Sequence, residues 1–275
     1  MTKTGVVLSS GFFGFFAHAG FLASVREAGI DPAGYSGASS GAIVAAMASS
    51  GMGDDDIKRM LFKVKREDFW DPDPWHVILK NILAFFKGYP GYLKGDRFAR
   101  LLNDLPVRRF EDCKKPLAIS AANLTRQNDT IFTSGDLIDA VRASGAVPML
   151  FKPVEINESM YVDGGIVNKA PVKALADLIK PDRIFVHYIS SGNMAGSMNS
   201  FLKKRITPWH IYQMSISISR QEAYQRQCEL VRQQGIEVVE IKTNTPELGP
   251  NQLKLGPDAY ETAKRSADKI LLNHI

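Results

Sequence analysis

A serine between glycines is the first feature of this sequence that could carry covalent chemistry. Gly37-Ala38-Ser39-Ser40-Gly41 fits the pattern G-x-S-x-G, in which a tight turn from a strand into a helix projects the serine hydroxyl. The N-terminus of that helix would lie beside the hydroxyl and favour a developing negative charge. The pattern therefore predicts that Ser39 is a nucleophile. A serine at such a turn also commonly caps a helix, so a structural role stays open.

Asp163 is the candidate for the general base that a serine nucleophile needs. Such a base has to lie within about 3 Å of the hydroxyl, because a free serine alkoxide is inaccessible at neutral pH. Asp163 ends a short apolar run and precedes Gly164 and Gly165, which leave its carboxylate uncrowded. An aspartate in an ordinary turn has similar neighbours. The sequence thus predicts a Ser39/Asp163 pair and keeps a purely structural aspartate as the alternative.

Alternating strands and helices are predicted around the serine. Residues 5–9 have the pattern of a short buried strand, and residues 17–28 have helical periodicity. The same order recurs in residues 33–36 and 42–48, on the two sides of the glycine turn. Repeated strand, turn and helix units favour a parallel, doubly wound sheet with helices on both faces. We therefore expect a three-layer α/β/α fold with a mainly parallel central sheet.

The rest of the chain extends this pattern and adds a predicted cap. Residues 54–104 look helical but are interrupted by prolines and glycines, so we interpret them as a helical cap on a single domain that covers residues 1–275. The further expected strands are 116–122, 130–133, 161–163, 183–189 and 237–241, and the further expected helices are 136–143, 208–233 and 257–272.

The composition argues against several classes of protein. The chain has 275 residues, of which 45% are apolar, so it can bury a large core. Its net charge of +5 arises from 34 basic and 29 acidic residues, which lie along the whole chain and do not form the basic surface of a nucleic-acid-binding protein. Cys113 and Cys228 cannot form a disulfide framework, and no Cys/His cluster suggests a metal site. We expect neither a metal nor another cofactor.

The hydropathy pattern predicts a cytoplasmic location. The apolar residues 5–8 are followed at once by Ser9, Ser10 and Gly11, which does not resemble a secretory signal. No run reaches the roughly 18 apolar residues that a membrane-spanning helix needs. The expected protein touches a membrane, if at all, from one side. No oligomeric state follows from the sequence.

Four blocks of sequence, in order, resemble the patatin-like phospholipase family between residues 5 and 171. They are similar to that family's first turn with its helix, its nucleophile turn, the segment before its acid and its D-G-[GA] motif. The blocks are Leu8-Ser9-Ser10-Gly11 with Ala17-His18-Ala19-Gly20-Phe21-Leu22, Gly37-Ala38-Ser39-Ser40-Gly41, Ala143-Ser144-Gly145-Ala146-Val147-Pro148, and Asp163-Gly164-Gly165 with Asn168 and Pro171.

The resemblance implies a serine-dependent lipid acyl hydrolase of the phospholipase A or esterase type. It implies a patatin-like fold and a Ser39/Asp163 dyad, in which the carboxylate takes the serine proton directly and a fatty acyl ester is cleaved through an acyl-enzyme. The histidines are then dispensable, and His18 is expected to pack and hydrogen bond inside its helix. A hidden triad that uses one of the other histidines stays open. These are His76, His187, His210 and His274.

The first turn departs from the family pattern. The family typically reads G-G-G-x-[RK]-G there, whereas Ser10-Gly11-Phe12-Phe13-Gly14-Phe15 keeps one glycine in register and lacks the basic residue. Backbone amides do not depend on the side chain, so Gly11, Phe12 and Gly14 are the expected donors of the oxyanion hole. A phenylalanine with positive φ would be strained. The altered turn motivates a rival function, a catalytically silent relative that binds lipid or a partner protein. A dinucleotide-binding turn is a second and weaker rival, since the motif is not G-x-G-x-x-G.

Three apolar segments have two interpretations each. Phe12, Phe13, Phe15 and Phe16 are either a structural plug or the lining of an acyl-binding slot beside Ser39. Residues 76–87, flanked by tryptophans and tyrosines, suit either an interfacial helix or lid, or a helix buried against the sheet or a second subunit. The apolar residues within 194–202 precede the basic residues 203–205 and form either a membrane-facing segment or a solvated turn.

Overall fold

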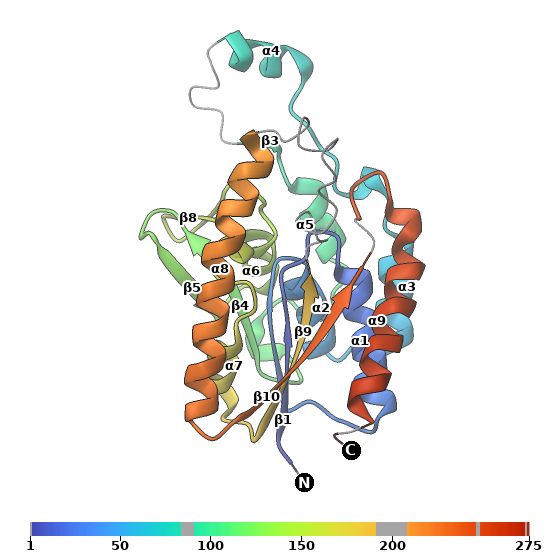
Figure 1. Ribbon diagram of the computed structural model, residues 1–275. Coiled ribbons are helices and arrows are strands. Elements are labelled where there is room, and N and C mark those ends of the chain that lie inside the picture. The colour runs from blue at the N-terminus through green and yellow to red at the C-terminus, as the bar shows by residue number, and fades with distance from the viewer. Residues whose placement is uncertain (1, 84–90, 191–207, 246–247, 273, 275) are drawn as a thin grey trace, which may run out of the picture.

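A mainly parallel sheet forms the centre of the protein (Figure 1). The computed structural model describes residues 2–83, 91–190, 208–245, 248–272 and 274. The eight-stranded sheet has the order β10-β9-β1-β2-β4-β8-β7, with β5 also paired to β4. The strands from β10 to β4 are parallel, and β5, β7 and β8 are antiparallel to their neighbours. The predicted sheet is confirmed.

The strands are short and mostly buried. Their bounds are β1 Thr4–Leu8, β2 Gly34–Ala38, β4 Leu117–Asn123, β5 Asn128–Phe132, β7 Val154–Ile156, β8 Ser159–Asp163, β9 Arg183–Ser190 and β10 Glu237–Asn244, with β3 Gly91–Leu93 and β6 Met149–Phe151 paired separately. In β1, Val6 and Leu8 face one apolar cluster and Val7 faces the other. Because both faces are covered, β1 is apolar at each of these positions and does not alternate.

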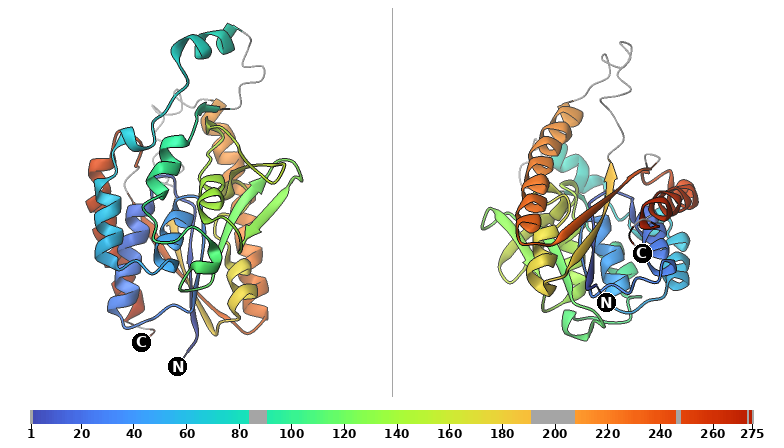
Figure 2. Two further views of the ribbon diagram at one scale, coloured as in Figure 1. Left: turned by 180° about the vertical axis from the view of Figure 1, so that it is seen from behind. Right: turned by 60° about the horizontal axis from the view of Figure 1, so that its bottom comes forward.

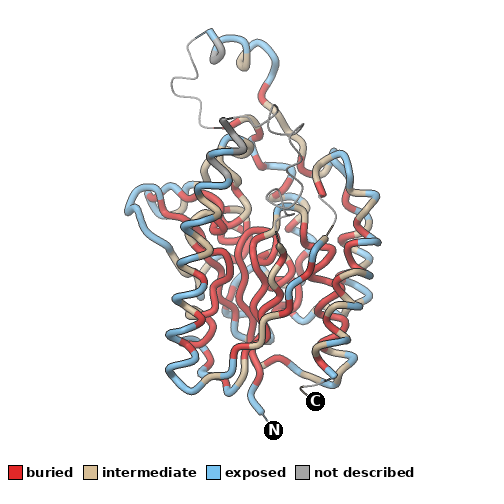
Figure 3. The backbone as a smooth tube through the Cα atoms, in the orientation of Figure 1, coloured by how far each residue is buried: buried red, intermediate tan, exposed pale blue. Residues whose placement is uncertain are grey.

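Helices cover both faces of the sheet, which gives the predicted three layers (Figures 1 and 2). One face carries α1 Phe15–Glu27, α2 Ser40–Ser49, α3 Asp54–Lys63, α5 Asp96–Leu102, α6 Leu137–Ser144 and α9 Gly256–Leu271, and the other carries α7 Val172–Ile179 and α8 Pro208–Gln233. Short 3-10 turns are η1 Arg66–Asp68, η2 Phe110–Asp112, η3 Gly164–Ile166 and η5 Leu253–Leu255. Figure 3 shows that the buried residues concentrate in the sheet and on the inner sides of these helices.

The segment 54–104 does not act as one unit. Helix α3 packs against α1 within the helical layer, and α5 packs against α6. Helix α4, Trp75–Leu83, instead projects from the body of the protein (Figures 1 and 2). Trp75 is 76% exposed and Leu83 is 74% exposed, so these side chains are not buried within this chain. Every helix in the described part of the chain is too short or too polar to cross a bilayer.

Several predicted boundaries move by a few residues. The expected helix 17–28 begins at Phe15, and the expected strand 33–36 continues to Ala38, so that it leads directly into Ser39. Residues 149–151, in a proline-flanked segment without a predicted strand, form β6, which pairs with β3. The predicted helical residues 84–87 and the apolar and basic segment 194–205 lie outside the described residues.

Candidate active site

Ser39 occupies a strained turn at the carboxyl end of β2. Its φ of 54° and ψ of −122° lie outside the left-handed region that non-glycine residues visit with positive φ. Its backbone N–H donates to Ser144 Oγ at 2.8 Å, and Ser144 Oγ donates to the carbonyl oxygen of Ser120 at 2.7 Å. A buried serine on α6 thus fastens the turn to β4. Such strain concentrates at functional sites, where the surrounding structure enforces it.

The glycines of the turn are required by close backbone contacts. A methyl group on Gly41 would lie 2.2 Å from the carbonyl oxygen of Leu8, at the end of β1. One on Gly37 would lie 2.5 Å from the backbone of Gly41. The G-x-S-x-G spacing therefore lets the start of α2 approach β1, which leaves Ser39 between the first turn and β4.

Asp163 ends β8 and hydrogen bonds to Ser39. Ser39 Oγ donates to Asp163 Oδ2 at 2.6 Å, although the two residues are 124 positions apart. The other carboxylate oxygen, Oδ1, accepts the N–H of Gly165 at 2.7 Å. Sheet register explains the meeting, because Ala38 lies opposite Ser120 in β4 and the next residue of β4 lies opposite Asp163.

The environment of Asp163 raises the pKa of its carboxyl group toward neutrality. The side chain is buried, which raises the pKa of Asp163 from 3.8 to about 6. The hydrogen bonds from Ser39 and Gly165 and the positive charges of Arg220 and Lys169 act in the opposite direction and limit the rise. A carboxylate with this pKa can accept a proton at neutral pH and return it later in a reaction.

Two cations flank Asp163 that sequence reasoning missed. Lys169 is 2% exposed, and its Nζ donates to the carbonyl oxygen of Ser10 at 2.7 Å. Burial, together with the charge of Arg220, lowers the pKa of Lys169 to about 7, while Asp163 opposes this change. Arg220 on α8 donates from Nη1 to the carbonyl oxygen of Gly165 at 3.2 Å. No local pattern marks either residue, because both reach the site through tertiary packing.

The first turn closes on itself through Gly14. The N–H of Gly14 donates to the carbonyl oxygen of Gly11 at 2.8 Å, so the expected oxyanion donor Gly14 is already engaged. In the described part of the chain, the N–H groups of Gly11 and Phe12 have no acceptor. Phe12 has a φ of 54°, the strained conformation that the sequence made us consider, and is 49% exposed. Of the three expected donors, Gly11 and Phe12 are thus the two whose N–H groups have no acceptor among the described residues.

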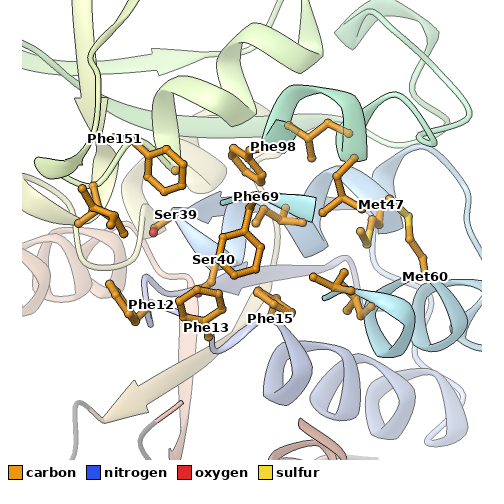
Figure 4. A pocket seen from close by; sticks show the side chains of 18 residues that line it. Phe12, Phe13, Phe15, Ser39, Ser40, Met47, Met60, Phe69, Phe98 and Phe151 are labelled. Atoms are coloured by element: carbon orange, nitrogen blue, oxygen red, sulfur yellow. The ribbon is translucent and has the colours of Figure 1, made fainter. Parts of the chain in front are cut away.

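An apolar pocket opens beside Ser39 (Figure 4). The space inside the pocket and in front of its mouth, open solvent included, amounts to about 730 Å³. The lining of the pocket comes from the first turn, the start of α1, α2, α3, the segment 64–69, α5 and the segment 145–151. The lining residues are Phe12, Phe13, Phe15, Ser39, Ser40, Ile43, Met47, Met60, Leu61, Val64, Phe69, Phe98, Leu101, Leu102, Gly145, Val147, Leu150 and Phe151. Ser39 and Ser40 are the hydroxyl-bearing members of an otherwise apolar wall.

The phenylalanines of the first turn divide between two roles. Phe12, Phe13 and Phe15 line the pocket. Phe16 is buried in the core, where its ring contacts that of Phe62 at a centroid distance of 5.7 Å. Residues of the expected cap, from α3, α5 and the segment 64–69, complete the pocket, whereas no described side chain of α4 lines it.

The buried histidines serve the first turn. His18 Nε2 donates to the carbonyl oxygen of Ser9 at 2.8 Å, so its Nδ1 accepts from His187 Nδ1 at 2.7 Å, and His187 Nε2 accepts from Thr243 Oγ1 at 3.0 Å. Burial lowers the pKa of His18 to about 3, which keeps this chain of bonds neutral. Among the side chains that the structure describes, which exclude that of His210, no histidine hydrogen bonds to Ser39 or Asp163.

Within the described residues, no group of three or more His, Cys, Asp or Glu side chains is arranged to hold a metal ion. The chemistry that the site can perform with its own groups is proton transfer between Ser39 and Asp163, followed by nucleophilic attack by Ser39 Oγ.

Comparisons with known proteins identify the family of this chain and several relatives. The profile of a family described as patatin-like phospholipase matches residues 6–176. An uncharacterized NTE family protein of Mycobacterium tuberculosis is 26% identical over 176 residues, covering 63% of this chain and 46% of that protein. A probable lipid hydrolase of invertebrate iridescent virus 6 is 31% identical over 68 residues, which is 23% of each chain. This chain therefore spans less than half the length of either relative.

A solved structure has a related fold. The crystal structure of VipD from Legionella pneumophila aligns with a TM-score of 0.50 at 16% sequence identity, covering 98% of this chain and 67% of that one. At this identity, the similarity concerns the fold alone.

Proposed function

Since this chain belongs to the patatin-like phospholipase family, we propose that it hydrolyses fatty acyl esters of lipids through Ser39 and Asp163. The observation that carries the proposal is the 2.6 Å hydrogen bond from Ser39 Oγ to Asp163 Oδ2 at the wall of an apolar pocket. A relative named as a probable lipid hydrolase supports the same class of reaction.

Acylation begins with proton transfer inside the dyad. Asp163 Oδ2 accepts the proton of Ser39 Oγ while the oxygen attacks the ester carbonyl carbon. The tetrahedral oxyanion accepts hydrogen bonds from the N–H groups of Gly11 and Phe12, which have no other acceptor in the described residues. When the intermediate collapses, the carbon–oxygen bond to the alcohol breaks, and protonated Asp163 gives its proton to the leaving alkoxide.

Deacylation repeats the same steps with water. Asp163 takes a proton from a water molecule as the water attacks the acyl-enzyme carbonyl carbon. Collapse then breaks the bond to Ser39 Oγ, the serine regains the proton from Asp163, and the fatty acid leaves. The cycle ends with the dyad as it began.

The pocket supports an apolar acyl chain as the substrate group next to Ser39. Its wall is almost wholly aliphatic and aromatic, as is usual for sites that bind apolar ligands. Burial of methylene groups contributes about 0.8 kcal/mol each. A long acyl chain would therefore bind more tightly than a short one, until the pocket is full.

Helix α4 supports contact with a lipid surface. Trp75, Leu79 and Leu83 recur every four residues on one side of α4 and are 76%, 47% and 74% exposed. The N-terminal turn of α8 lies toward the same end of the protein (Figures 1 and 2), and Ile211 in this turn is 57% exposed. Apolar helix faces that carry tryptophan suit the boundary between headgroups and acyl chains.

We expect Leu83→Glu to reduce hydrolysis of phospholipid vesicles by about tenfold or more, since burial of a leucine contributes about 1.5–3 kcal/mol. Hydrolysis of a monomeric short-chain ester should stay within twofold of the parent. The matched control is Leu272→Glu, because Leu272 is 75% exposed at the opposite end of the protein (Figure 1). Equal loss in both variants, or loss on the monomeric ester, would contradict membrane contact through α4.

Labelling with a fluorophosphonate tests the proposed function directly. The parent protein should be labelled on one serine and should hydrolyse long-chain esters. Ser39→Ala should lose both the label and the hydrolysis. Asp163→Ala should be labelled at least about 10²-fold more slowly than the parent protein, because it lacks the base. Ser266→Ala on α9 is the control, since the Ser266 hydroxyl donates only to Thr262 within its own helix.

A parent protein that is neither labelled nor active would reject the proposed hydrolysis. If such a protein still bound a phospholipid analogue, the altered first turn would instead belong to a silent lipid-binding relative. Persistent turnover in Ser39→Ala would assign the reaction to another group.

A further inference from the structure

Lys169 holds the first turn from two directions. Its Nζ donates to the carbonyl oxygen of Ser10 at 2.7 Å, and its own carbonyl oxygen accepts the N–H of Ser10 at 2.7 Å. Both groups lie in the interior, with Ser10 4% exposed and Lys169 2% exposed. The mechanism above gives Lys169 no task, although a buried lysine is costly unless its charge has partners.

The carbonyl that Lys169 contacts belongs to the same peptide group as the N–H of Gly11. The chain has no cis peptide bond in its described part, so this carbonyl and this N–H point in opposite directions. A cation at the carbonyl oxygen therefore leaves the N–H of Gly11 on the far side of the peptide group. Consecutive hydrogen bonds through one peptide group polarise one another. The ammonium group at the Ser10 carbonyl oxygen therefore makes the Gly11 N–H a stronger hydrogen-bond donor.

We propose that Lys169 is a positioning residue, whose ammonium group orients and polarises the Ser10–Gly11 peptide so that the Gly11 N–H stabilises the oxyanion. The inference rests on the proposed function. It assigns to a lysine from the segment after Asp163 the task of stabilising a turn that has lost most of its glycines.

The charges around Lys169 make its role depend on pH. Its ammonium lies near the Asp163 carboxylate on β8 and the Arg220 guanidinium on α8, and 5.0 Å from the centre of the Tyr188 ring on β9. His18 on α1 also faces it but stays neutral. Burial lowers the pKa of Lys169 to about 7, so the ammonium is lost as the pH rises through neutrality.

The pH profile of kcat/KM in the parent protein should therefore be bell-shaped. The acid limb reports loss of the Asp163 carboxylate near pH 6, and the alkaline limb reports loss of the Lys169 ammonium near pH 7. Lys169→Arg keeps a charge at all these pH values and should remove the alkaline limb. Lys169→Met should remove this limb and also lower the maximum by about 10- to 100-fold, mainly in kcat, because one oxyanion donor is weakened.

Affinity for a long-chain alkyl trifluoromethyl ketone separates this role from a structural one. The ketone forms a hemiketal oxyanion with the serine, whereas the matching alkyl ether does not. In Lys169→Met, ketone affinity should fall about 10- to 100-fold while ether affinity stays within twofold. Lys173→Met is the matched control, because the half-buried Lys173 lies on α7, where it pairs with Asp177 at 2.6 Å and does not contact the first turn.

Three results would overturn the inference. They are an unchanged alkaline limb in both variants, equal loss of ketone and ether affinity in Lys169→Met, and full kcat in a Lys169→Met protein. If Lys169→Met does not fold, the pH profile of Lys169→Arg is the test, and an alkaline limb that persists in this variant contradicts the inference. An inactive parent protein would reject the proposed function, whereas an active, fluorophosphonate-labelled parent with insensitive Lys169 variants rejects only the role of Lys169.

Discussion

Asp163→Asn is expected to abolish ester hydrolysis and, above about pH 6, to raise the free energy of unfolding relative to the parent protein. Asparagine cannot accept the Ser39 proton, so kcat/KM should fall by at least about 10⁴-fold. The amide still fits the site, since its Oδ1 can accept the Gly165 N–H and its Nδ2 can donate to Ser39 Oγ. The substitution thus removes a buried charge and keeps the hydrogen bonds.

The sign of the stability change follows from the pKa of Asp163. Burial raises the pKa of Asp163 from 3.8 to about 6, so between these pH values the folded protein keeps a proton that the unfolded chain releases. The contribution of Asp163 to stability is full below pH 3.8 and is lost as the pH rises through 6. Asparagine does not titrate, so its contribution to the free energy of unfolding does not change over this pH range.

Unfolding by urea between pH 4 and pH 8 checks this expectation. The variant and the parent protein should be about equally stable at the low end and should diverge as the pH rises, by about 1–2 kcal/mol above pH 6. The full pKa shift corresponds to about 3 kcal/mol, but Arg220 and Lys169 lose an anionic neighbour in the variant. Asp177→Asn is the control, because Asp177 is 57% exposed on α7. A constant difference across this pH range would contradict the assignment.

The pairing of Ser39 with Asp163 was within reach of the sequence, because each residue lies in a local pattern that a strand and its turn dictate. The distance between them was not. It depends on β4, which lies between β2 and β8 and sets both registers through backbone hydrogen bonds. A strand order that is not sequential leaves no trace in hydrophobic periodicity.

Lys169 and Ser144 illustrate what a local reading leaves out. A lysine after an asparagine and before Ala170 has the pattern of a solvated turn, yet tertiary packing buries Lys169, which is 2% exposed. Ser144 lies in a recognisable block, but its role is to link two other elements. Its hydroxyl hydrogen bonds to Ser39 in the turn after β2 and to Ser120 in β4. Residues whose roles depend on three elements at once cannot be found from one segment.

The first turn departs from the expected arrangement at Gly14 for a related reason. Glycine was expected to mark each amide that faces the oxyanion, so Gly14 was included among the donors. The structure instead uses Gly14 to close the turn onto Gly11, and a phenylalanine takes the positive φ. The bonds of Ser9 to His18 and His187 fasten the chain just before the turn. Distant contacts thus enforce a conformation that local propensity disfavours.

Strain at Ser39 leads to a second prediction with a large effect on activity. Ser39→Gly and Ser39→Ala both remove the nucleophile and should lose hydrolysis by about 10⁴- to 10⁶-fold. Both also lose the hydrogen bond to Asp163, so that loss cancels in their comparison. The φ of 54° and ψ of −122° are open to glycine and strained for alanine, a difference of about 1–3 kcal/mol.

Glycine should therefore be the more stable replacement at Ser39. The greater freedom of glycine in the unfolded chain opposes this by about 0.5–1 kcal/mol, so the glycine variant is expected to exceed the alanine variant by about 1–2 kcal/mol in urea unfolding. The same pair at Ser266 in the middle of α9 should have the reverse order, by about 1 kcal/mol, because helical backbone favours alanine. If alanine were the more stable residue at both positions, the turn would hold no strain, and the conformation of Ser39 would need another explanation.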